Sequence, residues 1–324
     1  MVESLCSQII WGCDPQRQLE VAWLRSLLSN PVEEELLALT DVALDRVLIS
    51  GGRVLVESGL LRLEREKNEA HLALQRRQRE SRLAALEKMG SFILLHLSDE
   101  EGFDGDELYP MLPSGTVVWR NFPYPRFSQA PWAETIHTFP IGPRGEFLSP
   151  GFLLPIDQRP YPWSFMGTLW SSGSRVLATS LFLKDLPQGF FHGGKCFARG
   201  IPLQQYKAVL GQSVFALCPE GDRHLDTFRL YESLQMGCIP LLVDFQDQAV
   251  ALLGPNCPIP CFPTWQHALD SARKWLAAPD QLSLLHDCVW DWWVDKRFSL
   301  TRSLAFSLGI QDVVEVSPEV LSSS

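Results

Sequence analysis

The 324-residue chain lacks the features that mark several common classes of protein. It has no run of roughly 20 apolar residues that would cross a bilayer, and residues 1–20 lack the basic and apolar stretches of a signal peptide. Basic residues are also few, since 28 Lys and Arg stand against 38 Asp and Glu, a net charge of −10. A nucleic-acid binder usually presents a basic face. We therefore expect neither a transmembrane segment nor a nucleic-acid partner.

The cysteines show no metal-binding or disulfide pattern. There are eight of them, none in a C-x-x-C pair, and Cys257 and Cys261 flank Pro-Ile-Pro without neighbouring histidines. Cys196, Cys218 and Cys238 lie in apolar stretches, which is typical of buried free thiols in a reducing compartment. The sequence thus predicts a cytoplasmic protein without a zinc site.

What the chain does contain is enough apolar sequence for two domains. Hydrophobic residues make up 46% of a chain twice the usual domain length. A proline-rich segment at 151–163 is the best candidate for a linker, because proline disfavours helix for itself and for the preceding residue. We therefore predict an amino-terminal domain at 1–150, the linker at 151–163, a carboxy-terminal domain at 164–310 and a tail at 311–324.

The pattern of apolar residues predicts strands and helices in both halves. The first half has a helix candidate at 16–29, two short β-branched segments within 46–59, a long charged helix at 60–89, and strands at 92–97, 116–121 and 137–142. The second half alternates more regularly, with strands at 163–169, 189–194, 213–219 and 239–244 and helices at 174–186, 203–212, 226–236, 264–277 and 280–308. Such alternation favours an α/β fold with a doubly wound parallel sheet.

In sheets of this kind ligands bind beyond the carboxyl ends of the strands. One such junction leads into the short helix 226–236, for which Asp226 is a predicted N-cap. Arg229 and Glu232 lie three residues apart on one face of that helix. An arginine there suits a diphosphate and a carboxylate suits ribose hydroxyls. The alternative is an exposed ion pair without function.

A second junction of the second half, between the strand 163–169 and the helix 174–186, carries small residues and a cation. Gly167 ends one strand and would allow close approach of a ligand to the backbone. Arg175 falls in the first turn of the next helix, where a cation opposes the helix dipole unless an anion lies beside it. Gly221 lies in the loop before the helix 226–236.

In the first half, Asp99 and Glu100 follow a buried strand. A carboxylate at that position is a natural general base, and the alternative is a simple acidic loop. The Asp104-Gly-Asp106 triplet imitates a metal-binding D-x-D, but short acidic matches are common by chance, so no metal is expected. Arg120 and Arg126 would contact a phosphorylated acceptor or pair with the acidic loop.

The stretch 206–244, "YKAVLGQSVFALCPEGDRHLDTFRLYESLQMGCIPLLVD", resembles the nucleotide-binding signature of exostosin-type glycosyltransferases. That signature has C-P-x-G at the end of a strand, R-x-x-E on the next helix and then G-x-I-P. The segment 159–175 is similar to the ribitol-phosphate xylosyltransferase branch, and 92–144 has a looser likeness to it. Residues before 90 and after about 250 carry no resemblance.

The resemblance implies a GT-B architecture, in which two Rossmann-like domains face a central cleft. It implies an inverting, metal-independent transfer from a UDP-sugar such as UDP-xylose to a hydroxyl of a glycan or a phosphorylated polyol, with no other cofactor. The matching positions make Gly167, Arg175, Gly221, Arg229 and Glu232 donor-binding residues, and we add Tyr231 of the same helix. Asp99 or Glu100, at the end of the strand 92–97, is the expected base. Two alternatives remain open: a GDP-sugar enzyme of the fucosyltransferase type, and a non-catalytic nucleotide-binding module.

Overall fold

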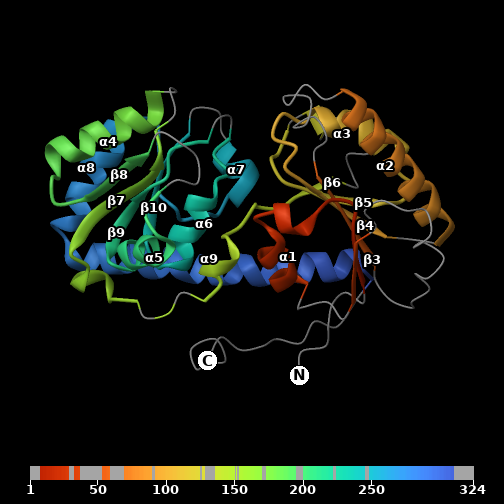
Figure 1. Ribbon diagram of the computed structural model, residues 1–324. Coiled ribbons are helices and arrows are strands. Elements are labelled where there is room, and N and C mark those ends of the chain that lie inside the picture. Colours follow the sequence, from red (N-terminus) through yellow and green to blue (C-terminus); the bar gives the residue numbers. More distant parts are fainter. Residues whose placement is uncertain are drawn as a thin grey trace. The chain divides into compact units, whose positions relative to one another are not determined.

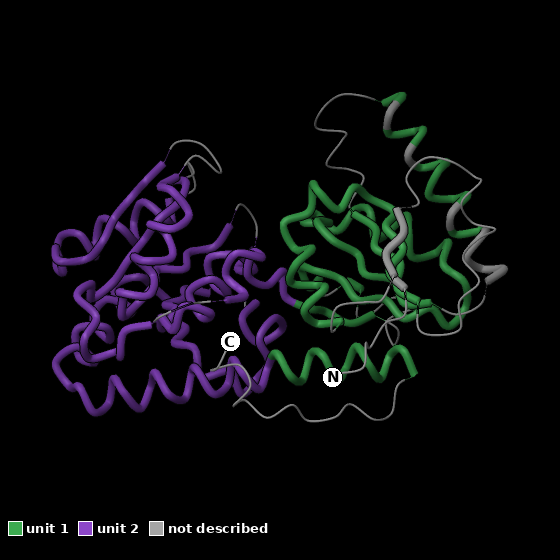
Figure 2. Tube along the Cα trace, turned by 60° about the horizontal axis from the view of Figure 1, so that its bottom comes forward, with its two compact units in different colours: residues 1–139, 297–324 green, residues 140–296 purple. Residues whose placement is uncertain are grey.

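The computed structural model divides the chain into two compact units, Met1–Phe139 with Arg297–Ser324, and Pro140–Lys296 (Figure 2). We call them unit 1 and unit 2. The structure describes residues 8–28, 33–36, 53–58, 69–89, 92–124, 126–127, 136–149, 151, 153–169, 173–194, 200–221, 224–244 and 248–309. Among these residues, no helix is both long and apolar enough to cross a membrane.

Unit 1 is built on a six-stranded sheet of order β2-β1-β3-β4-β5-β6 in which the described pairings are all parallel (Figure 1). The strands are β1 Gln8–Trp11, β2 Glu33–Leu36, β3 Arg53–Ser58, β4 Ile93–Leu97, β5 Val117–Arg120 and β6 Ile136–Thr138. The helices are α1 Val21–Leu27, α2 Glu69–Met89 and α3 Phe103–Leu108. All five residues of β4 are buried, as its continuous apolar sequence requires of a strand covered on both faces.

Unit 2 has a five-stranded sheet of order β11-β10-β9-β7-β8, again with parallel pairings. Its strands are β7 Tyr161–Thr168, β8 Phe190–Gly194, β9 Ser213–Leu217, β10 Ile239–Val243 and β11 Cys261–Phe262. Its helices are α4 Gly173–Asp185, α5 Leu203–Gly211, α6 Phe228–Gln235, α7 Gln248–Leu253 and α8 Trp265–Leu276. Helices α4 and α8 contact each other, whereas α5 packs on β7 and β9 and α6 on β10 (Figure 1).

The last helix, α9 Pro279–Ser307, contributes to both units. Its residues up to Lys296 belong to unit 2, where Trp293 is buried and donates from Nε1 to Gln235 Oε1 at 3.1 Å. Its last turns belong to unit 1, where Trp119 Nε1 donates to Ser307 Oγ at 3.1 Å. Short 3-10 helices lie at Pro15–Arg17, Tyr109–Met111, Gly145–Phe147 and Ile156–Gln158.

The structure confirms most of the predicted elements and corrects several boundaries. Residues 140–150 group with unit 2 and Arg297 onwards with unit 1, so the division differs from 1–150 and 164–310. The predicted linker 151–163 overlaps β7, which begins at Tyr161. The prolines there do not prevent a strand, because proline is tolerated at the start of a strand. Strands β1, β2 and β11 and helices α3 and α7 were not predicted. The segments 46–52 and 60–68 and the tail 311–324 lie outside the described residues.

Candidate active site

The sheet of unit 2 has a topological switch point between β7 and β9. The chain leaves β7 for β8 on one side, and leaves β9 for β10 on the other. The loops that follow β7 and β9 therefore diverge and leave a crevice at the carboxyl ends of these strands, where ligands of open α/β sheets bind. This is the position at which the sequence placed Gly167, Arg175, Gly221 and Arg229.

Arg175 links the two loops of the switch point. Its side chain is buried, Nη1 donates to Thr168 O at 2.7 Å and Nε donates to Glu220 O at 3.1 Å. Thr168 ends β7 and Glu220 follows β9, so one guanidinium fastens both strand ends. The cation in the first turn of α4 is therefore explained by carbonyl oxygens, where the sequence analysis invoked an anion. Arg175 therefore has a structural role, because it holds together the two loops that follow β7 and β9.

Arg229 reaches from α6 back to β7. Its Nε donates to Met166 O at 3.3 Å, and the guanidinium carbon lies 4.5 Å from the centroid of the Phe165 ring. A Cβ atom at position 167 would collide with Arg229 Nη2, so only glycine leaves room for this guanidinium. Nη1 is buried and has no hydrogen-bond partner in the described part of the chain. A buried cationic N–H without an acceptor is costly, which indicates a missing anionic partner.

Glu232 is enclosed by two side chains that the sequence analysis did not single out. Its Oε1 is ion-paired with Arg144 Nε, and its Oε2 accepts from the Tyr206 hydroxyl at 2.9 Å. Burial lowers the pKa of Arg144, but the charge and hydrogen bond of Glu232, together with the smaller effects of Tyr206 and Glu146, outweigh burial and the pKa is raised overall. Burial, and then Glu232, raise the pKa of Tyr206 well above its usual value, so this hydroxyl remains a neutral donor. No spacing rule links Arg144 or Tyr206 to Glu232, because 88 and 26 residues separate them.

Two other predicted donor-binding residues have structural contacts. Tyr231 is fully buried, donates to Asp226 Oδ1 at 2.6 Å and packs 5.8 Å from the Trp293 ring, so it belongs to the core. Asp226 is not the N-cap, which is Thr227 without a side-chain cap bond. Gly221 donates from its backbone N to His224 O at 2.7 Å and so closes a turn before α6.

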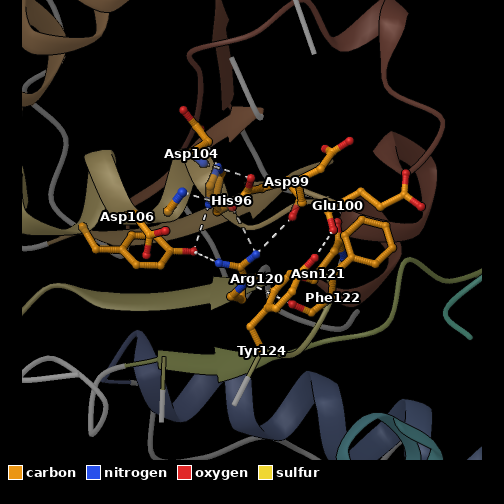
Figure 3. Close-up of polar contacts among 12 residues, drawn as sticks. His96, Asp99, Glu100, Asp104, Asp106, Arg120, Asn121, Phe122 and Tyr124 are labelled. Atoms are coloured by element: carbon orange, nitrogen blue, oxygen red, sulfur yellow. Dashed lines mark hydrogen bonds and ion pairs between the residues drawn. The ribbon is translucent and has the colours of Figure 1, made fainter. Parts of the chain in front are cut away.

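In unit 1, Asp99 is buried and both of its carboxylate oxygens are occupied (Figure 3). Oδ1 accepts from Asp104 N at 3.1 Å, and Oδ2 accepts from Gly105 N at 3.0 Å and from Arg120 Nη2 at 3.1 Å. Asp99 therefore fixes the start of α3, a helix where the sequence analysis expected an acidic loop. Its carboxylate is poorly placed to take a proton from a substrate.

The Asp104-Gly-Asp106 triplet does not present two carboxylates to a common ligand. Asp104 is buried, accepts from Arg79 Nη1 at 2.8 Å and lies 2.8 Å from His96 Nε2 (Figure 3). Asp106 is exposed and pairs with Arg126 at 3.1 Å. Within the described residues, no group of three His, Cys, Asp or Glu side chains is arranged to hold a metal ion.

Glu100 is the half-buried carboxylate of the predicted pair. Its backbone oxygen accepts from the Tyr124 hydroxyl, which fixes the main chain at this position (Figure 3). Arg120 is buried and donates to carbonyl oxygens and to Asp99, so it has no open face for a phosphorylated acceptor. Because the carboxylate of Asp99 holds the start of α3, Glu100 is the better candidate of the two predicted bases.

Comparison with known proteins identifies the class of fold. No protein-family model matches the chain. An alpha-glucosyltransferase in complex with UDP and a 13-mer DNA containing an HMU base superposes with a TM-score of 0.53 at 9% identity, covering 91% of this chain and 99% of that one. The DNA-modifying enzyme beta-glucosyltransferase, solved with and without uridine diphosphoglucose, gives a TM-score of 0.50 at 12% identity, covering 93% and 99%. The chain therefore has the α/β fold of the GT-B architecture.

One curated relative is also similar in sequence. Ribitol-5-phosphate xylosyltransferase 1 of Homo sapiens is 25% identical over 170 residues. The match takes in 49% of this chain but only 32% of that protein, so this chain spans about a third of the relative it matches. The comparisons do not place the chain in the exostosin family, and that resemblance stays a prediction.

Proposed function

We propose that this protein is a glycosyltransferase that binds a UDP-linked sugar at the switch point of unit 2. The observation that carries the proposal is the buried Nη1 of Arg229 beside Gly167, which has no acceptor within the part of the chain that the structure describes. The GT-B fold and the similarity to a xylosyltransferase support the same assignment.

The charges around Arg229 favour a bound anion. Arg144 is paired with Glu232 and lies near a second carboxylate, Glu146, whereas Tyr206 is neutral. Arg229 donates from Nε to Met166 O, and its Nη1 has no acceptor among the described residues. A diphosphate would supply that acceptor, since its oxygens accept charge-assisted hydrogen bonds from a guanidinium. Glu232 already binds Arg144 and Tyr206, but a carboxylate has about four acceptor sites and can still receive a ribose hydroxyl.

In the proposed reaction, an acceptor hydroxyl oxygen attacks the anomeric carbon of the donor. The bond from that carbon to the diphosphate oxygen breaks, the nucleotide departs with the electron pair, and Glu100 takes the hydroxyl proton. Attack opposite to the leaving group inverts the anomeric centre. Arg229 stabilises the charge that develops on the leaving diphosphate, an electrostatic contribution that often exceeds others in such reactions.

The donor sugar, the acceptor class and the metal requirement are further parts of the proposal. UDP-xylose is the donor that the xylosyltransferase relative suggests, and a glycan or polyol phosphate is the acceptor class. A metal-independent reaction remains part of the proposal. A GDP-sugar enzyme and a non-catalytic nucleotide-binding module are the competing assignments, and donor hydrolysis distinguishes both from the proposed function.

The test compares thermal shifts with UDP and GDP, followed by hydrolysis assays with UDP- and GDP-sugars, each with and without a divalent metal. We expect UDP to stabilise the protein by about 2.7 kcal/mol at a hundredfold excess over Kd. Arg229→Gln should weaken UDP binding by about 10- to 100-fold, since a charge-assisted pair contributes about 1.5–3 kcal/mol. The matched control is Arg273→Gln, an exposed arginine of the same unit. Stabilisation by GDP alone, or equal UDP binding by both variants, contradicts the proposal.

A further inference from the structure

A second cluster of unusual features lies at the carboxyl ends of β4 and β5 in unit 1. The aromatic side chains of Phe103 and Tyr124 and the guanidinium of Arg126 meet there, and we call them the aromatic platform. Arg126 lies 5.9 Å from the Phe103 ring centroid and 4.7 Å from that of Tyr124. Phe103 is 56% exposed, although its ring is large and wholly apolar.

The platform is held in place and is not a loose surface loop. Arg126 Nη2 pairs with Asp106 at 3.1 Å and donates to Glu101 O at 3.4 Å. The hydroxyl of Tyr124 donates to Glu100 O. Gly102 has a φ of 74° and lies so close to Tyr124 that a Cβ atom would approach ring carbons at 2.9 Å. These contacts hold Tyr124 and Arg126 in place, and the exposed ring of Phe103 lies next to Arg126.

Backbone strain marks the same edge of the sheet. Ser98 follows β4 with a φ of 58°, and Phe122 follows β5 with a φ of 57°. Residues other than glycine rarely adopt these left-handed angles, which persist only when the surroundings impose them and which gather at functional sites. Here the imposing contacts include Arg120 Nε donating to Phe122 O at 3.2 Å. Two such residues on neighbouring strands indicate a site at this edge.

The chemistry of the platform favours an uncharged ligand. Carboxylates at Glu100, Glu101 and Asp106 outnumber Arg126, and Arg126 is already paired with one of them. A phosphate would meet net negative charge. The C–H groups of a sugar ring carry slight positive charge and pack well on the negative face of an aromatic ring, and sugar hydroxyls donate to carboxylates.

We propose that the aromatic platform binds an uncharged carbohydrate as the sugar acceptor. This inference rests on the proposed function and makes it narrower, because it selects a neutral glycan over a phosphorylated polyol. A sugar on the platform would also lie near Glu100, because the platform residue Tyr124 donates its hydroxyl to Glu100 O. Glu100 could then take the proton of the acceptor hydroxyl.

The experiment measures ligand binding to the full chain by saturation-transfer NMR. The probes are the methyl glycosides of glucose, galactose and xylose, with ribitol 5-phosphate, glucose 6-phosphate and a 13-mer DNA for comparison. We expect at least one neutral glycoside to bind. Phe103→Ala should weaken that binding about 5- to 10-fold, as expected for the loss of one aromatic stacking contact. Phe306→Ala is the control, because Phe306 is 80% exposed in the same unit.

Several results would overturn the inference: preferential binding of a phosphorylated probe or of DNA, no glycoside binding, or equal effects of the two phenylalanine variants. The thermal shift with UDP separates this inference from the proposed function. Phe103→Ala should leave that shift unchanged. A wild-type protein that binds glycosides but not UDP would refute the transferase and retain the carbohydrate site.

Discussion

At the scale of single residues, the buried ion pairs of unit 1 show how a charge is accommodated in a core. Asp104 is 1% exposed, and burial by itself raises the pKa of its carboxyl group. The hydrogen bond with His96 and the charge of Arg79 outweigh burial, so the pKa lies well below its usual value. The ionised carboxylate is therefore the form that stabilises the folded chain.

This shift predicts a pH dependence of stability. A carboxyl group with a lowered folded-state pKa contributes fully above its unfolded pKa of about 3.9, and the contribution falls as the pH drops below that value. Asp104→Asn should cost about 1.5–3 kcal/mol near pH 7, because the buried Arg79 loses its closer carboxylate and keeps only Glu57, whose Oε2 lies 3.5 Å from Arg79 Nε. The difference from wild type should shrink towards pH 3. Urea unfolding from pH 3 to 7 measures both effects.

The control for this prediction is Asp106→Asn, on the same helix. Its pair with Arg126 is 40–50% exposed, and exposed pairs contribute about 0–1 kcal/mol. A cost for Asp104→Asn that is equal at pH 3 and pH 7 would show that its charge is not the stabilising feature.

At the scale of elements, the end of α6 determines how this short helix enters β10. Gly237 has a φ of 64°, its N donates to Leu234 O at 3.0 Å, and Cys238 N donates to Ser233 O at 2.8 Å. These two bonds form a Schellman motif, in which the residue after the C-cap is left-handed. Glycine adopts left-handed angles without steric cost, so Gly237 is a helix-ending signal that the sequence itself carries.

Gly237→Ala should therefore lower stability by about 1–2 kcal/mol, the cost of a left-handed L-residue. A Cβ at this position would also approach Arg159 Nη2 at 2.9 Å, which adds to the cost. Gly173→Ala at the start of α4 is the control, since a Cβ there meets nothing within 4 Å. Thermal unfolding of both variants provides the comparison, and equal melting temperatures would contradict the assigned motif.

At the scale of the whole molecule, we assign different tasks to the two units. Unit 2 has Arg229 at its switch point, with a buried Nη1 that has no acceptor in the described residues, and unit 1 has Glu100 and the aromatic platform. Arg229→Gln should therefore reduce both UDP binding and sugar transfer. Glu100→Gln should lower the rate of sugar transfer by about 100-fold or more, as expected for the loss of a general base, and leave UDP binding unchanged. Calorimetric titration with UDP and a transfer assay measure the two effects.

The paired measurement tests the assignment of the base. The conservative change Glu100→Asp should recover part of the transfer activity, because it keeps a carboxylate. If Glu100→Gln turns over like wild type, Glu100 is not the base. If it loses UDP binding, the carboxylate serves the fold or the donor site instead.

The sequence by itself determined most of the strands and helices of unit 2, although not α7 or β11, because alternation of apolar runs, Gly237 and the prolines act locally. It also placed Gly167 at the end of a strand and Arg175 and Arg229 at the start of helices that follow strands, positions that a parallel sheet gathers at one edge. Only the tertiary structure decided what each side chain contacts. Arg175 binds two carbonyl oxygens, Tyr231 lies in the core, and Glu232 faces Arg144 from 88 residues away. Partners so distant in sequence follow from packing, which no local pattern encodes.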